Sequence, residues 1–296
     1  MNRAERRRHQ RRNNTPSPHL RHRTSTLTDQ EQQKKTIGVA LQHHSSGRIS
    51  EAKKLYQRVL NSNPNHIDAL HLIGVAFHQE GLNEEAVLHI RKAITQKPDF
   101  AEAHCNLGAA LIALGKPDQA EISYKKAVAI QPLYAEAHCY LGKALQSQGK
   151  DIEAVKSFEK AVSIKPDFED ANVGWGNALK DIGEYEKAIK IYTKVISQNP
   201  QFAEAHCNLG NAHKELGRLN DALESYKNAL EIDPNLAEVH TNAAIIIEKL
   251  GDLESAETYY KKALSLKPYP DALGSYGLML VSLGRWKEAT KKYDEK

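Results

Sequence analysis

Prolines and glycines recur along this sequence at a constant interval of 34 residues. They are Pro64, Pro98, Pro132, Pro166, Pro200, Pro234 and Pro268, and Gly81, Gly115, Gly149, Gly183, Gly217 and Gly251. A fixed period of this length is typical of arrays in which one supersecondary unit is repeated and stacked. Each unit then buries its apolar face on its neighbours, so the 296 residues need no single central core.

Each period contains two helical patterns. In the period from 101 to 134, Ala103, Leu107 and Leu111 recur at the spacing of one helix face, and Gly115 ends that pattern. A second amphipathic pattern follows and ends at Pro132. The sequence therefore predicts an all-α fold, a right-handed α-solenoid (superhelix) of helix-turn-helix repeats.

The charge is distributed unevenly. The formal net charge is +4, but residues 1 to 28 hold eight Arg and one acidic residue, so this segment carries +7 and the rest of the chain −3. Residues 1–27 have almost nothing to bury and are predicted to be a disordered Arg-rich tail. Thr28 and Glu31 form a capping-box pattern, which predicts the first helix start. The tail is interpreted as a solubilising segment, a contact for nucleic acid or an anionic surface, or a transit peptide.

The cysteines and the recurring histidines predict structural roles. Equivalent residues of successive repeats should lie on the order of 10 Å apart, too far for a disulfide or for one shared metal ion. We therefore expect free thiols in a reducing, cytoplasmic setting, packing histidines, and no metal or other cofactor. The N-terminus has positive charge without an apolar run, and no apolar stretch is long enough to span a bilayer. The residues concerned are Cys105, Cys139 and Cys207, and His104, His138, His206 and His240.

Acidic residues occupy the first turn of the expected first helix in seven successive repeats, at Asp68, Glu102, Glu136, Asp170, Glu204, Glu238 and Asp271. Negative charge at this end complements the helix dipole, so we expect a stabilising role for this row and no binding role. The sequence contains no Walker loop, nucleophile elbow or HExxH motif. Gly174 and Gly176 lie inside a helix pattern and are interpreted as packing glycines. The chain is therefore predicted not to be an enzyme.

The repeats closely resemble the tetratricopeptide repeat. Counting from Ala101, a small residue stands at place 8, alanine at place 20 and an aromatic residue at place 24, as at Gly108, Ala120 and Tyr124. The resemblance covers about 28–296 and divides it into repeats at about 33–66, 67–100, 101–134, 135–168, 169–202, 203–236 and 237–269, with a partial repeat at 270–296. It implies that first helices line a concave groove that binds a protein or peptide.

Asparagines are the residues of this groove that indicate binding. Asn106, Asn208 and Asn242 share place 6, and Asn177 and Asn211 share place 9, one turn along the same face. A primary amide offers a donor and an acceptor, so it can satisfy the backbone of an extended peptide, although a solvated face explains it equally. Lys180 and Lys214 are placed at the rim of this predicted peptide-binding groove.

The phrase Ala-Glu-Ala-His-Cys-Asn-Leu-Gly, at 101–108 and 203–210, resembles the repeats of O-GlcNAc transferase. That resemblance implies an asparagine ladder for extended substrates, here interrupted at Leu72, Tyr140 and Gly174. The favoured function is a non-enzymatic protein-binding scaffold. The alternative is the substrate-recognition segment of an O-GlcNAc-transferase-like or other transferase, whose catalytic domain would follow Lys296. The lysine and arginine pattern of a chaperone-tail clamp is not met.

Overall fold

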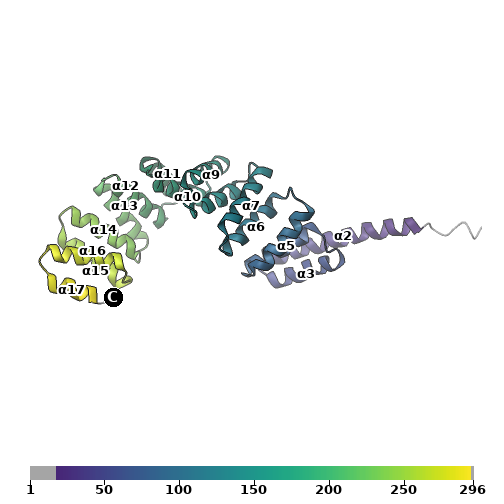
Figure 1. Cartoon of the computed structure of the whole chain (residues 1–296), viewed down its shortest axis with the longest axis horizontal. Coiled ribbons are helices and arrows are strands. Elements are labelled where there is room, and N and C mark those ends of the chain that lie inside the picture. The colour runs from purple at the N-terminus through teal and green to yellow at the C-terminus, as the bar shows by residue number, and fades with distance from the viewer. Residues whose placement is uncertain (1–17, 295–296) are drawn as a thin grey trace, which may run out of the picture. The chain divides into compact units, whose positions relative to one another are not determined.

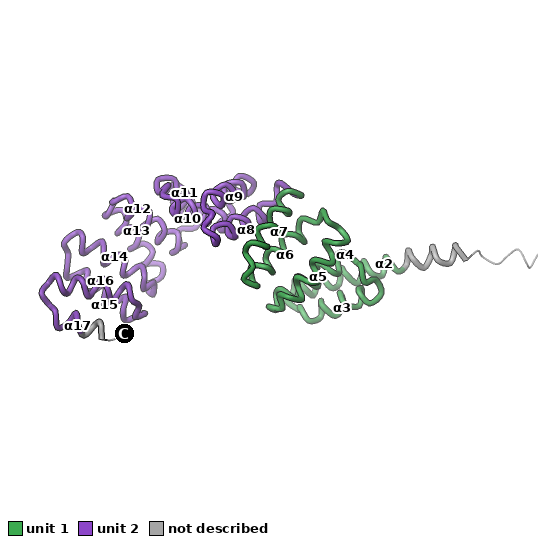
Figure 2. Tube along the Cα trace, in the orientation of Figure 1, with its two compact units in different colours: residues 1–130 green, residues 131–296 purple. Residues whose placement is uncertain are grey.

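The computed structural model describes the backbone of residues 18–294 and the side chains of residues 29–290. This part of the chain is entirely α-helical, and its helices form two compact units, residues 1–130 and 131–296 (Figure 2). The helices of the first unit are α2 (Pro18–Ser45), α3 (Ile49–Ser62), α4 (Ile67–Gln79), α5 (Asn83–Gln96), α6 (Ala101–Ala113) and α7 (Pro117–Ile130). The all-helical repeat fold is confirmed.

The second unit continues the same alternation of first and second helices (Figure 1). Its helices are α8 (Ala135–Gln146), α9 (Asp151–Ile164), α10 (Glu169–Asp181), α11 (Tyr185–Gln198), α12 (Ala203–Glu215), α13 (Leu219–Ile232), α14 (Ala237–Lys249), α15 (Leu253–Leu266), α16 (Pro270–Ser282) and α17 (Trp286–Asp294). Even-numbered helices are the first helices of the repeats, and odd-numbered helices are the second.

The predicted start of the first helix at Thr28 is wrong, because α2 begins at Pro18. No proline or glycine stands between His19 and Leu27, so nothing in the sequence stops the helix from extending toward the N-terminus. The disordered tail stays a prediction, because residues 1–17 lie outside the described residues and only the backbone of 18–27 is described.

Glycines set the spacing and the turns of the repeats. A Cβ on Gly108 would lie 2.6 Å from the Tyr124 ring, and one on Gly210 would lie 2.6 Å from the Tyr226 ring. Only glycine therefore lets the two helices of these repeats approach so closely. Gly115 follows α6 with φ of 68°, the left-handed conformation that ends a helix. A Cβ on Gly174 or Gly176 would likewise lie 2.5 Å from an aromatic ring, which confirms the packing role of these glycines.

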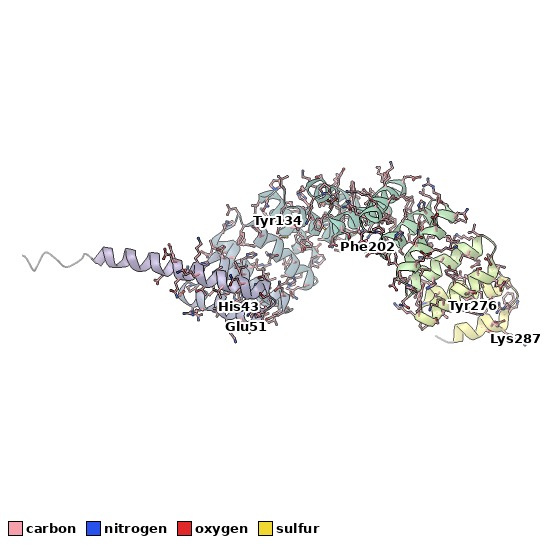
Figure 3. The ribbon with its side chains drawn as sticks, turned by 180° about the vertical axis from the view of Figure 1, so that it is seen from behind. His43, Glu51, Tyr134, Phe202, Tyr276 and Lys287 are labelled. Atoms are coloured by element: carbon pink, nitrogen blue, oxygen red, sulfur yellow. The ribbon has the colours of Figure 1, made fainter. Side chains whose placement is uncertain are left out.

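Tyrosines and aliphatic side chains fill the space between the helices. Tyr192, Tyr226 and Tyr260 are fully buried in the second unit, as is Tyr56 in the first. An apolar or aromatic residue also precedes most first helices. Phe202, labelled in Figure 3, precedes α12 and packs on a cluster that includes Val173 and Val195. No helix of the described residues is sufficiently long and apolar to cross a membrane.

Candidate functional site

Six of the seven predicted site residues lie on three successive first helices of the second unit. Asn177 and Lys180 are on α10, Asn208, Asn211 and Lys214 are on α12, and Asn242 is on α14. We call these six residues the amide face. All six are half-buried, so they are accessible while anchored in the helix layer. Nδ2 of Asn242 lies 3.4 Å from Oδ1 of Asn211, which joins the amides of two repeats.

Two amides of this face also support the scaffold. The hydroxyl of Tyr192 donates to Oδ1 of Asn177 at 2.6 Å, and that of Tyr226 donates to Oδ1 of Asn211 at 2.8 Å. Burial raises the pKa of both tyrosines, so they remain protonated donors at neutral pH. In two consecutive repeats, the residue at place 9 is therefore hydrogen-bonded to the residue at place 24. We did not predict this pairing from the sequence, although both residues recur with the 34-residue period.

Asn208 is the amide whose hydrogen-bonding groups are free. It is half-buried on α12 and has no hydrogen-bond partner among the described residues. Beside it, the Cys207 thiol accepts a long contact of 3.9 Å from Nδ2 of Asn211. Burial raises the pKa of Cys207 to about 11, so the thiol is protonated and unreactive at neutral pH.

The two lysines of this face, and Lys143 on α8, already have carboxylate partners. Lys143 on α8 contacts Asp170 at 2.8 Å, Lys180 contacts Asp181 at 3.0 Å and Lys214 contacts Glu215 at 3.7 Å. These pairs are partly exposed and each stabilises the fold only weakly, by about 0–1 kcal/mol. They leave little uncompensated positive charge for gripping an anionic group.

Asn106, the seventh predicted site residue, lies on α6 in the first unit. Its Nδ2 lies 2.8 Å from Nε2 of His71. Because the amide nitrogen can only donate, Nε2 of His71 must be the unprotonated acceptor. Burial lowers the pKa of His71, which keeps the ring neutral. The amide nitrogen of Asn106 is therefore directed to its own scaffold rather than free like that of Asn208.

The recurring histidines bind backbone, as the packing interpretation expects. Nε2 of each lies 2.9 to 3.1 Å from the carbonyl oxygen of the proline six residues earlier. Since a carbonyl only accepts, each ring carries its proton on Nε2. In the repeat at 169–202, Asn172 occupies the place of these histidines and donates to the carbonyl oxygen of Pro166 at 3.0 Å. The four pairs are His104 with Pro98, His138 with Pro132, His206 with Pro200, and His240 with Pro234.

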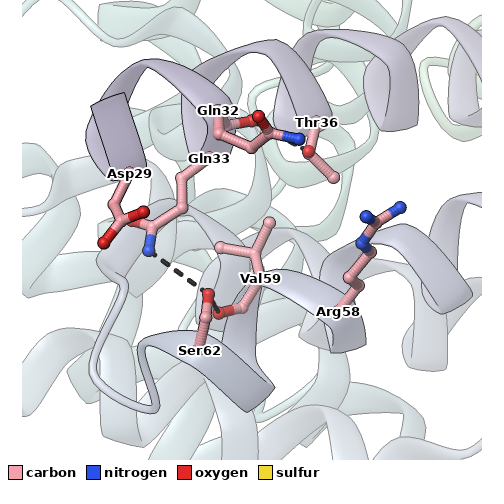
Figure 4. Close-up of a pocket in the computed structure, with 7 residues that line it drawn as sticks. All are labelled: Asp29, Gln32, Gln33, Thr36, Arg58, Val59 and Ser62. Carbon is pink, nitrogen blue, oxygen red and sulfur yellow. Dashed lines mark hydrogen bonds between the residues drawn. The ribbon is translucent and has the colours of Figure 1, made fainter. Parts of the chain in front are cut away.

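Two clefts are lined by residues that do not belong to the amide face. One is between α2 and α3 and is lined by polar residues that include Asp29 and Arg58, with Gln33 donating to Ser62 at 3.3 Å (Figure 4). The other, in the second unit, is lined by residues that include Pro200, His206 and Asn228. Within the described part of the chain no three metal-ligating side chains converge, and none of the three cysteines forms a disulfide. Neither cleft contains a residue of the predicted site.

Comparison with protein-family models identifies the family to which the chain belongs. Family models described as tetratricopeptide repeat match residues 99–167, 203–236 and 237–270, and a model described as TPR repeat matches 76–115 and 176–217. The chain is therefore a tetratricopeptide-repeat protein. Among curated proteins none matches this sequence significantly.

Solved structures show the same fold. MamA is 27% identical with a TM-score of 0.53, over 54% of this chain and 94% of that one. YrrB, titled a TPR protein with an unusual peptide-binding site, is 24% identical with a TM-score of 0.55, over 63% and 96%. A tetratricopeptide repeat protein from Parabacteroides merdae is 16% identical with a TM-score of 0.59, over 84% and 99%. The finer resemblance to O-GlcNAc transferase repeats stays a prediction.

Proposed function

We propose that this protein is a non-enzymatic protein-binding scaffold whose amide face holds an extended peptide. The observation that carries the proposal is the row of primary amides that crosses three successive first helices. Asn208 is free, and Asn242 has only a long contact to Asn211. The amide nitrogen of Asn177 is not used by its tyrosine bond, and that of Asn211 makes only the long contact to Cys207. Each amide can pair with a backbone N–H or C=O, so binding along the row would depend little on peptide sequence.

The repeat geometry supports an extended ligand. Neighbouring first helices are spaced on the order of 10 Å, and an extended chain advances roughly 3.3 Å per residue. One repeat therefore spans about three residues of a bound peptide. The peptide-binding site named for YrrB belongs to that protein, and we carry to this chain only the general role of the fold.

The test uses a peptide of known sequence. A peptide that binds the full chain is selected from a displayed random library, and its affinity is measured for wild type and for N208A/N242A. Each lost hydrogen bond should cost about 0.5–1.5 kcal/mol, so the double variant should bind about tenfold more weakly. Asn211 is left in place, because removing it would leave the buried Tyr226 hydroxyl without its acceptor.

The matched control is N220A on α13, an exposed asparagine of a second helix. Its affinity should equal that of wild type, and all variants should keep the wild-type melting temperature. Unchanged affinity in N208A/N242A, or an equal loss in N220A, contradicts the assignment of the ligand to the amide face.

A further inference from the structure

The first-helix layer of the second unit is strongly acidic. Helices α8, α10, α12, α14 and α16 carry nine carboxylates against four lysines, whereas α9, α11, α13 and α15 carry nine against eight. The helix dipole explains the carboxylates in the first turns, and from the sequence alone we expected this row to have no role beyond that. It does not explain why the excess of negative charge is confined to the layer that holds the amide face.

Among the described residues, three of these carboxylates accept no hydrogen bond and form no ion pair. Glu204, Glu238 and Asp271 begin α12, α14 and α16, are exposed, and make no ion pair among the described residues. Glu204 and Glu238 both act on the Cys207 thiol, whose pKa is raised chiefly by burial and further by these two charges. They therefore border the amide face rather than facing away from it. The two lysines that also act on this thiol, Lys180 and Lys214, are paired with Asp181 and Glu215.

The opposite charge is concentrated in one segment of the same chain. Residues 3–12 hold six arginines and a single acidic residue, Glu5. Basic side chains stand at every third residue, at Arg3, Arg6, His9 and Arg12. In an extended chain that spacing is about 10 Å, the same order as the step between neighbouring first helices.

The segment leads into a helix that reaches beyond its own hairpin. Helix α2 has 28 residues and its partner α3 has 14, so the N-terminal half of α2 extends past α3 (Figure 1). A helix rises about 1.5 Å per residue, so this half is roughly 20 Å long. Segment 3–12 therefore precedes a helix that is longer than its hairpin requires.

We propose that the acidic first-helix face of the second unit binds the arginine-rich segment 3–12 of a second copy of this chain. Guanidinium groups pair with Glu204, Glu238 and Asp271, one per repeat, while the amides of Asn208 and Asn242 bind the segment's backbone. The inference rests on the proposed function, since it names the extended peptide that the amide face would hold.

The test measures binding of a labelled peptide with the sequence of residues 1–14 by fluorescence anisotropy. The receptor is the full chain carrying R3E, R6E and R12E, so that its own segment does not compete. Adding E204Q, E238Q and D271N should weaken binding at least tenfold. The control substitutions E159Q, E224Q and E231Q remove three exposed carboxylates of the second helices α9 and α13 and should leave it unchanged. Equal affinity in both sets overturns the inference.

Charge reversal guards against a loss caused by misfolding. A peptide with Glu at positions 3, 6 and 12 should bind a chain carrying E204R, E238R and D271R, and failure of this swapped pair while both chains keep their helical spectra contradicts the pairing. Wild-type chain should also form larger species as its concentration rises and dissociate at high salt, since exposed ion pairs are screened. A chain that stays monomeric at every concentration contradicts the second copy as donor.

Failure here is distinguishable from failure of the proposed function. If the library-selected peptide still loses affinity in N208A/N242A while the 1–14 peptide never binds, the amide face is a peptide site and the arginine segment is not its ligand. If neither peptide responds to N208A/N242A, both proposals fail.

Discussion

The first helices of the two units present different surfaces on the same scaffold. In the first unit, places 9 and 12 include the exposed side chains Leu41 and Ile112, which are 44% and 42% exposed. In the second unit the same places include Asn177, Asn211 and Lys214, and among them only Leu278 of the last repeat is a strongly exposed apolar residue. The small and aromatic residues that set helix spacing are alike in both units. The difference indicates that repeat packing does not constrain the side chains at these two places. We therefore infer that the residues at these places are related to what each unit binds.

The largest expected effect tests whether the scaffold is the same in both units. G108A and G210A each place a Cβ at 2.6 Å from a tyrosine ring, which should destabilise the fold by about 1–3 kcal/mol. G274A meets no atom within 4 Å and should instead stabilise α16 by about 0.5–1 kcal/mol through helix propensity. Urea unfolding followed by circular dichroism measures all three. A similar shift in all three variants would show that close packing at place 8 does not set the spacing.

The next effect concerns a contact that belongs to the second unit. N211A removes the acceptor of the fully buried Tyr226 hydroxyl and should cost about 1–3 kcal/mol of unfolding free energy. Y226F alone removes the donor and should cost less. In N211A/Y226F the loss should be smaller than the sum of the single losses, because the unpaired hydroxyl is gone. Strict additivity would mean that the two residues do not interact.

The smallest effect concerns His71 in the first unit, whose pKa is lowered by burial and partly restored by Glu102 and Asp68. In the unfolded chain this ring takes up a proton near its ordinary pKa of 6.5, while in the folded chain it stays neutral to lower pH. The unfolded state is therefore favoured as pH falls from 6.5 toward the folded pKa, and the contribution of His71 is complete above that range.

Unfolding by urea at several pH values would detect this fall, and H71Q should make it shallower by removing the titrating group. The remaining slope has other sources, because burial also lowers the pKa of His138 and His213 in the second unit. An identical pH profile in wild type and H71Q would contradict the claim that His71 is a neutral acceptor for Asn106 in the folded chain.

The fold could be predicted from the sequence because the residues that set the helix packing recur at the same places in several repeats. Gly115 and Pro132, for example, bracket α7 as the period requires. The start of α2 could not be predicted in this way, since the chain before Thr28 has no equivalent in the other repeats. The family match and the helix pairs agree on the architecture without reference to any single residue.

For the candidate site, the sequence could predict which repeat positions lie on the candidate binding face, but not the hydrogen-bond partners of each side chain. Because Asn106 and Asn208 occupy the same place of the repeat, the sequence predicts the same role for both, but their hydrogen-bond partners differ. The first contacts His71 across the repeat boundary, and the second has no partner among the described residues. Such contacts depend on which side chain the neighbouring repeat contributes. The tyrosine bonds to Asn177 and Asn211 likewise join residues 15 positions apart and became visible only in the folded hairpin.

The most direct measurement compares the two units with one ligand. The library-selected peptide is titrated against N208A/N242A in the second unit and against N106A in the first. The account predicts about a tenfold loss of affinity for N208A/N242A. It predicts little change for N106A, because that amide nitrogen already contacts His71. An equal loss in N106A, or no loss in N208A/N242A, would contradict the claim that binding belongs to the amide face of the second unit.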